Sequence, residues 1–342
     1  MTKPIIVSCS PFFEGWQKMA PELTGDKALW IFYEDRPRFF WERAIRRRNL
    51  AMLRISFQAA KRAACGDVRI LITHDRATQY CALLCRLFRI RVYHYVHSFN
   101  FPELPVGLRL LLLRFAFQQI ARFSVHSTME RTLYSRYFHI AEDRIRVRLW
   151  SIDIPKVSPG YPLVEGRYVS SIGGNGRDYR TLLEACRILP HIGFVLVVRP
   201  ENLMGLDVPP NVRVIVNAPF EEAMNVLQYS AFTVLPLPTS NTPCGHVTLV
   251  CAMHLGKTVV ATASAGIADY VFHGRNGLTC APSSPQSMAD AIHQLWANTA
   301  ETALLSEENR RFGAEHCSEA RARNDLASVL AERDIGLSAE HF

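Results

Sequence analysis

Residues 236–282 read PLPTSNTPCGHVTLVCAMHLGKTVVATASAGIADYVFHGRNGLTCAP, and this stretch decides the fold. A loop leads to Gly245, which opens a helix that ends at the turn around Gly256. A buried strand follows, and two further glycine turns close the stretch. This order is typical of one βαβ step, in which the free N–H groups of a helix N-terminus face a ligand.

The same alternation of short β-rich runs and helical runs extends along the whole chain. Its length of 342 residues suits two domains. We expect strands near 4–8, 28–33, 69–73, 91–96, 122–126 and 144–149, and then near 168–172, 194–198, 212–216, 232–235, 258–261 and 277–279. Helices are expected at 40–64, 78–88, 104–120, 129–137, 179–188, 220–229, 246–255 and 287–298, with a helical tail at 303–333. The pattern predicts an α/β protein with parallel, doubly wound sheets.

The proline- and glycine-rich stretch 151–166 reads as a linker. We therefore expect two Rossmann-like domains, 1–155 and 156–342, with the final helix packing back onto the first.

The net charge of +8 is unevenly distributed. Residues 1–155 hold 25 lysines and arginines against 13 carboxylates, whereas residues 156–342 hold 14 against 18. An anionic partner is therefore expected at the first half. Nucleic acid is not favoured, because the sequence has neither zinc-finger spacing nor an RNA-binding aromatic motif.

The cysteines and apolar runs indicate a reducing compartment. The nine cysteines are scattered and form no CxxC pair. The opening apolar run, Ile5–Val7, is far shorter than the core of a signal peptide. Arginines interrupt the apolar helix at 104–123, which argues against a membrane span. We expect a cytoplasmic protein.

A glycine turn at 173–176 follows the first strand of the second half. Glycines between a strand and a helix let backbone N–H groups approach an anion, and Arg177 stands at the mouth of that turn. An ordinary βα turn remains the alternative. The pattern is not GxGxxG with a later acidic residue, so no dinucleotide cofactor is expected.

Residues 168–285 resemble the C-terminal domain of GT-B glycosyltransferases, nearest to glycosyltransferase family 4. The resemblance rests on the order and spacing of several segments, namely 173–185, YSAF at 229–232, AMHLGK at 252–257, VVAT at 259–262, GIADY at 266–270 and HGRNGL at 273–278. The first half fits more loosely, through YVHS at 95–98 and SVHS at 124–127. The resemblance implies two Rossmann-like domains that face each other across a cleft.

The resemblance also implies where a nucleotide-sugar donor binds. Arg177 matches the basic residue that contacts the diphosphate, and the helix start at 245–248 matches backbone donors to the phosphate and sugar. The expected donor-binding set is Gly174, Gly176, Arg177, Arg199, Gly245, His246, Val247, Thr248 and Cys251.

An active-site histidine is implied at His97, at the end of a strand of the first half, with His94 on the same strand as its competitor. Glu14, Asp75 and Glu103 are the candidate general bases for an inverting reaction. Neither a metal nor a cofactor is expected, and no DxD motif occurs.

The sequence departs from the family at two positions. The family has two glutamates eight positions apart around the donor-site helix, and here these positions hold Pro243 and Cys251. Neither side chain accepts a charge-assisted hydrogen bond, so a retaining mechanism is in doubt. Asn241, His246 and Thr248 are substitutes that could bind sugar hydroxyls. A catalytically inactive GT-B pseudo-enzyme and a nucleotide-sugar epimerase are the two alternatives to a transferase.

Two features of the first half suggest its acceptor. Arginines crowd 36–62 beside Phe39–Trp41, and a leucine-rich helix near 104–120 carries further arginines. Such a surface suits an anionic bilayer, and a solvated helix packed by its apolar side is the alternative. The aromatic stretch 12–18 is expected to be a loop at the ligand-binding edge of the sheet. The predicted protein transfers a sugar from a UDP- or GDP-sugar to a saccharide or lipid-linked acceptor at the inner face of the cell membrane.

Overall fold

The computed structural model describes residues 3–9, 16–34, 48–101, 103–238 and 244–335. The chain divides into two compact units, the first made of 1–148 with 323–342 and the second of 149–322. The expected boundary after residue 155 therefore lies a few residues beyond the observed division. The last helix belongs to the first unit.

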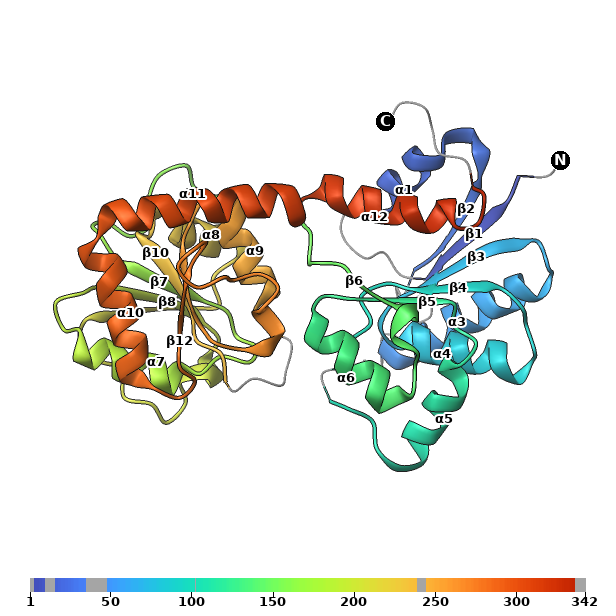
Figure 1. The fold of residues 1–342 in the computed structure, drawn as a ribbon, viewed down its shortest axis with the longest axis horizontal. Helices are drawn as coiled ribbons and strands as arrows, with labels where there is room; N and C mark the ends of the chain where they lie inside the picture. The colour runs from blue at the N-terminus through green and yellow to red at the C-terminus, as the bar shows by residue number, and fades with distance from the viewer. Residues whose placement is uncertain (1–2, 10–15, 35–47, 102, 239–243, 336–342) are drawn as a thin grey trace. The chain divides into compact units, whose positions relative to one another are not determined.

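The first unit is built on a six-stranded parallel sheet with strand order β2-β1-β3-β4-β5-β6 (Figure 1). Its strands are β1 (Ile5–Cys9), β2 (Leu29–Tyr33), β3 (Val68–Thr73), β4 (Tyr93–Val96), β5 (Arg122–Val125) and β6 (Ile145–Val147). Its helices are α1 (Trp16–Thr24), α3 (Arg48–Ala64), α4 (Asp75–Leu87), α5 (Gly107–Phe117), α6 (Thr128–Phe138) and α12 (Glu319–Ala331).

Alternation along the strands fills a core on each face of this sheet. Ile70 and Ile72 point to one face, where α1 and α12 cover them, whereas Leu71 packs with α3 and α4 on the other. Helix α12 contributes Leu326 and Leu330 to the first of these cores, so the end of the chain completes the N-terminal fold.

The second unit contains another six-stranded parallel sheet, of order β12-β11-β10-β7-β8-β9. Its strands are β7 (Val169–Ile172), β8 (Phe194–Val198), β9 (Val212–Val216), β10 (Phe232–Leu235), β11 (Val259–Thr262) and β12 (Leu278–Cys280). Its helices are α7 (Tyr179–Ile188), α8 (Phe220–Tyr229), α9 (His246–His254), α10 (Pro285–Ala297) and α11 (Thr299–His316). Short 3₁₀ turns lie in the first unit at η1 (Gly25–Lys27) and η2 (Glu142–Arg144), and in the second unit at η3 (Pro200–Leu203) and η4 (Ala265–Ile267).

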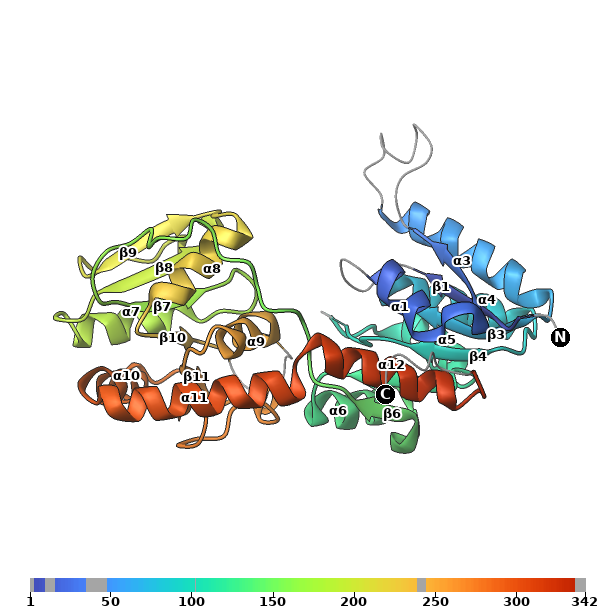
Figure 2. The ribbon, with the colours of Figure 1, turned by 90° about the horizontal axis from the view of Figure 1, so that it is seen from above.

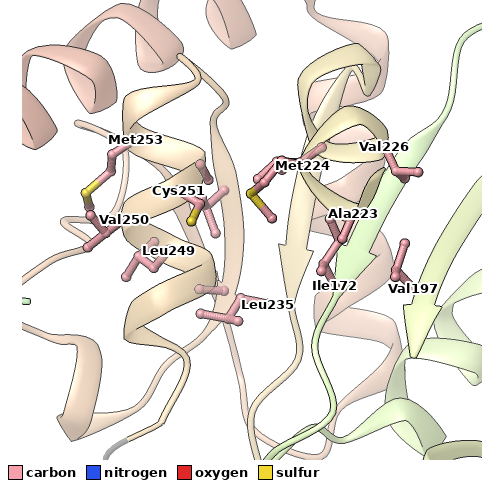
Figure 3. Close-up of a cluster of buried hydrophobic side chains, with 14 of the residues drawn as sticks. Ile172, Val197, Ala223, Met224, Val226, Leu235, Leu249, Val250, Cys251 and Met253 are labelled. Carbon is pink, nitrogen blue, oxygen red and sulfur yellow. The ribbon is translucent and has the colours of Figure 1, made fainter. Parts of the chain in front are cut away.

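The second sheet also has helices on both faces (Figure 2). Val195 and Val197 pack with α8 and α9, whereas Leu196 packs with α7 and α10. Figure 3 shows the first of these clusters, in which side chains from α8 and α9 meet those of the strands.

The strand order locates the position at which a ligand binds. The order in which strands are added reverses at β7 and β10, because β8 and β9 follow on one side of β7 whereas β10, β11 and β12 follow on the other side. In doubly wound sheets, ligands bind outside the carboxyl ends of the strands at such a switch point. Here the two loops at the switch point are the glycine turn after β7 and the segment that precedes α9.

Two expected elements differ from the structure. The helical tail is two helices, because α11 ends at His316 and α12 begins at Glu319. Trp16 begins helix α1 and is buried, where we expected an aromatic loop. Phe12, Phe13 and Glu14 lie outside the described residues. In the described parts of the chain, no helix is both long and apolar enough to cross a membrane.

Candidate donor site and histidine cluster

The glycine turn after β7 encloses the Arg177 side chain. Arg177 donates from Nη2 to Thr248 Oγ1 at 3.1 Å and from Nη1 to the Asn175 carbonyl at 2.8 Å. A Cβ on Gly173, whose φ is +125°, would lie 2.7 Å from Arg177 Nη2. Glycine is therefore required at this position, both by the backbone angle and by the approach of the guanidinium.

Within the described residues, Arg177 is a partly buried cation without a counter-charge. Its Nε is buried and has no hydrogen-bond partner there, and its guanidinium bonds a hydroxyl and a backbone carbonyl rather than a carboxylate. Burial lowers the pKa of Arg177. A partly buried guanidinium is stabilised when an anion pairs with it, so this geometry fits a binding site for an anionic group.

A second arginine lies over the same turn. Arg199 Nη1 donates to Asn175 Oδ1 at 2.9 Å, and Asn202 Nδ2 donates to the Gly174 carbonyl at 2.8 Å. A Cβ on Gly174 would lie 2.8 Å from the Arg199 side chain. Arg199 is exposed, so it adds positive charge to the turn from the solvent side.

The start of α9 lies at the same switch point. Gly245 has a φ of +94°, and a Cβ there would lie 3.0 Å from Leu235 Cδ2. Thr248 accepts from Arg177 and donates to the Ile172 carbonyl at 3.3 Å, which ties this helix to the end of β7. Val247 is exposed at the first turn. A Cβ on Gly176 would lie 2.9 Å from Cys244 Sγ, so the two loops are in close contact.

His246 is buried beside this helix start. Its Nε2 donates to the Gly266 carbonyl at 2.8 Å, and its ring stacks on Tyr270 with centroids 4.9 Å apart. Burial lowers the pKa of His246, although the Gly266 carbonyl acts in the opposite direction. The neutral ring is therefore the form that the unit holds near neutral pH.

Cys251 is not at the mouth of the site. Its side chain is fully buried in the core formed by α8, α9 and the strands, and it faces Met224 (Figure 3). Burial raises the pKa of its thiol to about 12, so the thiol stays protonated. The structure thus brings the other expected donor-site residues to one end of the sheet and leaves Cys251 in the core. Pro243 and Asn241 lie outside the described residues.

Lys257 has a structural role. Its Nζ donates to the carbonyl of Ser230, the C-cap of α8, at 2.9 Å. A cation at a helix C-terminus satisfies free carbonyls and opposes the negative end of the dipole.

In the first unit, three histidines gather at the carboxyl ends of adjacent strands. His74 follows β3, His97 follows β4 and His126 follows β5. The His97 ring centroid lies 6.4 Å from that of His74, 6.5 Å from that of His126 and 6.2 Å from that of Trp16. Burial lowers the pKa of His97 well below its usual range, and the two neighbouring histidines lower it further.

Hydrogen bonds fix the orientation of His126. Its Nδ1 donates to the Arg148 carbonyl at 2.9 Å, which leaves Nε2 to accept from Ser98 Oγ at 2.6 Å. Ser98 has a φ of +51°, so the chain turns sharply just after His97. Sequence reasoning missed His74 and His126, although each directly follows a strand.

His94 does not share the environment of His97. It is buried within β4, where Nε2 shares a 2.7 Å hydrogen bond with Thr73 Oγ1 and Nδ1 has no partner among the described residues. Burial lowers the pKa of His94 to about 3. His97 is therefore the strand-end histidine at the ligand-binding edge.

We expect the free energy of unfolding to fall as the pH drops below 6.5, partly through His94. The unfolded chain gains a proton near its usual pKa of about 6.5, whereas the native ring resists protonation down to about pH 3. Such a group lowers the free energy of unfolding by about 1 kcal/mol as the pH falls from about 6.5 to about 5.5. Urea titrations of the parent and His94→Gln across this range measure it, and equal pH slopes would contradict it.

The three candidate carboxylates differ in their distance along the chain from the histidine cluster. Asp75 is exposed at the first residue of α4, next to His74 and in the same edge region as His97. Glu103 is exposed in the connection before α5. Glu14 lies outside the described residues. Within the described residues, no cluster of three or more histidines, cysteines and carboxylates has the geometry of a metal site.

The two Rossmann-like units, each built on a six-stranded parallel sheet, have the GT-B fold. Residues 168–298, within the second unit, match the family model described as "Glycosyl transferases group 1".

Solved GT-B structures match nearly the whole chain. The Alr3699/HepE protein of Anabaena, solved in complex with UDP, is 15% identical with a TM-score of 0.69, over 96% of this chain and 100% of that one. A glycosyltransferase from Rickettsia africae is 13% identical with a TM-score of 0.69, over 97% and 99%. Sucrose-phosphate synthase from Thermosynechococcus elongatus is 14% identical with a TM-score of 0.70, over 97% and 99%. No curated protein matches the sequence.

Proposed function

We propose that the protein is a metal-independent glycosyltransferase of the hexosyltransferase type, which uses a nucleotide-sugar donor. The observation that carries this proposal is Arg177, a partly buried arginine whose buried Nε is unpaired within the described residues, at the switch point of the second sheet. A diphosphate is the anion whose size and charge suit a site made of a guanidinium, a glycine turn and the start of α9. Arg199 adds a second cation over the turn.

The proposed reaction breaks the bond between the anomeric carbon and the diphosphate oxygen, and the bonding electrons leave with the nucleoside diphosphate. The acceptor hydroxyl oxygen forms the new bond to the anomeric carbon, and its proton passes to a base. Arg177 and the backbone N–H groups at the start of α9 stabilise the charge that develops on the leaving group. This fixed positive charge is the reason that the reaction is proposed to need no divalent cation.

We assign His97 to the acceptor side of the reaction. Its lowered pKa keeps the imidazole neutral near pH 7, so it can accept a hydrogen bond from a sugar hydroxyl. Asp75 is the described carboxylate nearest to this cluster in the sequence, since it directly follows His74, and it is the proposed base for an inverting reaction. Glu14 remains a second proposed base.

A UDP- or GDP-sugar is the proposed donor, and the structures of the Anabaena protein with UDP and with UDP-glucose support this choice. The proposed acceptor is a saccharide or a lipid-linked saccharide in polysaccharide or glycolipid assembly. The basic first half supports such a setting, at the cytoplasmic face of the membrane.

Calorimetric titration of UDP-, GDP- and ADP-sugars tests the proposal, together with assays of donor hydrolysis and of transfer. We expect one nucleotide class to bind and to be turned over equally well with and without EDTA. Loss of turnover in EDTA would contradict the metal-independent mechanism. Failure of every donor to bind would contradict the donor site itself.

Cys251 favours one other function, that of a pseudo-enzyme that binds a nucleotide sugar without transferring it. The family has a glutamate at this position, and the buried thiol cannot replace its charge. The same titration separates the two functions, because binding without hydrolysis or transfer to any offered acceptor would establish the pseudo-enzyme.

A further inference from the structure

A cavity of about 580 Å³ opens at the amino end of β4, at the edge opposite to His97. Its lining includes four arginines, contributed by the end of α4, the segment that leads into β4 and the residues after α12, namely Arg86, Arg89, Arg91 and Arg333. Tyr93 forms part of the wall, and the Arg333 guanidinium lies 5.2 Å from the centre of its ring.

The charge of this cavity is not neutralised from within. In the described part of the chain, none of its four arginines pairs with a carboxylate, and Arg333 Nε is buried without a hydrogen-bond partner. The neighbouring carboxylates are engaged elsewhere. Glu332 binds Arg146, Arg122 and the Tyr93 hydroxyl, and Asp334 pairs with Arg69 at 3.6 Å. The cavity therefore suits a phosphate group.

An exposed apolar stripe runs along α5 toward the cavity. Leu108, Leu111, Leu112 and Phe115 follow helical spacing and are all exposed, Leu108 by 73%. The end of α4 adds Leu87 and Phe88, the latter 68% exposed. The Arg86 guanidinium lies 4.7 Å from the centre of the Phe115 ring, so it joins the stripe to the cavity.

The arginine cavity and the apolar stripe together favour a lipid surface over a soluble anion as the partner. A soluble phosphate compound needs the arginines but not the exposed leucines and phenylalanines, which cost free energy in water. Residues 76–122 contain seven arginines and one carboxylate, Glu103. An apolar stripe bordered by cations is the arrangement with which a helix lies in the interface of an anionic bilayer.

We propose that this surface docks the protein on an anionic membrane, with a lipid phosphate in the arginine cavity and the side chains of the stripe among the acyl chains. The proposal rests on the proposed membrane setting and is independent of sugar transfer. It places the membrane contact at the amino edge of the first sheet.

Flotation of the full-length protein with vesicles tests the proposal. The vesicles contain phosphatidylcholine alone or a mixture with phosphatidylglycerol. We expect binding to the mixed vesicles, and about 100-fold weaker partitioning of the triple variant Arg86→Gln/Arg89→Gln/Arg91→Gln, at about 1 kcal/mol per cation. Leu108→Ser/Leu112→Ser should also weaken binding.

The matched control is Arg180→Gln/Arg213→Gln/Arg275→Gln, which removes the same charge from exposed positions of the second unit. It should bind vesicles almost as well as the parent. Equal loss in both triple variants would show a non-specific charge effect and overturn the proposal. So would unchanged vesicle binding with reduced affinity for glycerol phosphate, which would indicate a soluble anion.

Circular dichroism confirms that each variant is folded, and nucleotide-sugar affinity is measured in the same preparations. Intact vesicle binding without any donor binding would contradict the proposed transferase and leave the docking surface standing. The reverse result would contradict the docking surface alone.

Discussion

Replacement of Arg177 by alanine is expected to weaken nucleotide-sugar binding about 100-fold, which corresponds to about 3 kcal/mol. The guanidinium is partly buried, and its buried Nε has no partner within the described residues. A diphosphate that binds there gains a charge-assisted hydrogen bond in surroundings of low dielectric constant. Calorimetry with the preferred donor and with the nucleoside diphosphate alone measures the change.

The stability of the ligand-free protein separates this role from a structural one. Because Arg177 is a partly buried charge without a counter-charge in the described part of the chain, its removal should leave the melting temperature unchanged or raise it. Arg180→Ala, in the first turn of α7 and exposed, is the control and should leave affinity unchanged. Unchanged nucleotide affinity in Arg177→Ala would remove the assigned role.

Gly173→Ala is expected to lower both stability and donor affinity. A φ of +125° is unfavourable for alanine, and the new Cβ would lie 2.7 Å from Arg177 Nη2. Backbone strain should lower the free energy of unfolding by about 2 kcal/mol. Displacement of the guanidinium should weaken donor binding at least about tenfold, because the donor then loses a charge-assisted hydrogen bond. Urea unfolding and calorimetry measure the two effects.

A double-mutant cycle tests the link to the guanidinium. In an Arg177→Ala background, Gly173→Ala should no longer reduce donor affinity, although its cost in stability remains. Gly205→Ala is the matched control, because Gly205 has a φ of +72° and no described atom lies within 4 Å of the position that a Cβ would take there. Gly205→Ala should lower the free energy of unfolding and leave donor affinity unchanged. Additive losses of affinity in the cycle would show that Gly173 acts independently of Arg177.

The strands were predictable from the sequence because they are short runs of β-branched and other apolar residues between turns. Phe194–Val198 is buried throughout, whereas Val212–Val216, at the edge of its sheet, is only partly buried, and both have the expected bounds. The GT-B fold follows from two such alternating patterns. The tail was harder, because charged residues continue across the break between α11 and α12, where Ser318 Oγ accepts a hydrogen bond from the backbone N–H of Arg321.

The candidate site was predictable in part. The glycine turn and Gly245 mark backbone positions with positive φ, and such positions are visible in a sequence. Alignment with the family predicted the position of Cys251 on the helix but not the direction of its side chain. The helix position is retained, but the small apolar side chain turns into the core with Met224. The histidine cluster depends on three strands that lie far apart in the sequence, so only the sheet order reveals it.

The discontinuous first unit has a consequence for synthesis of the chain. Residues 149–322 are continuous and can fold as soon as they leave the ribosome, whereas the earlier 148 residues lack α12 until residues 319–331 have also been made. Until then, the part of the first sheet's face that packs against Leu326, Val329 and Leu330 is uncovered, and of the described helices only α1 packs on that face. The half that is made first is therefore completed last. A stop codon before α12 would leave an exposed apolar face prone to aggregation, even though it spares every expected site residue.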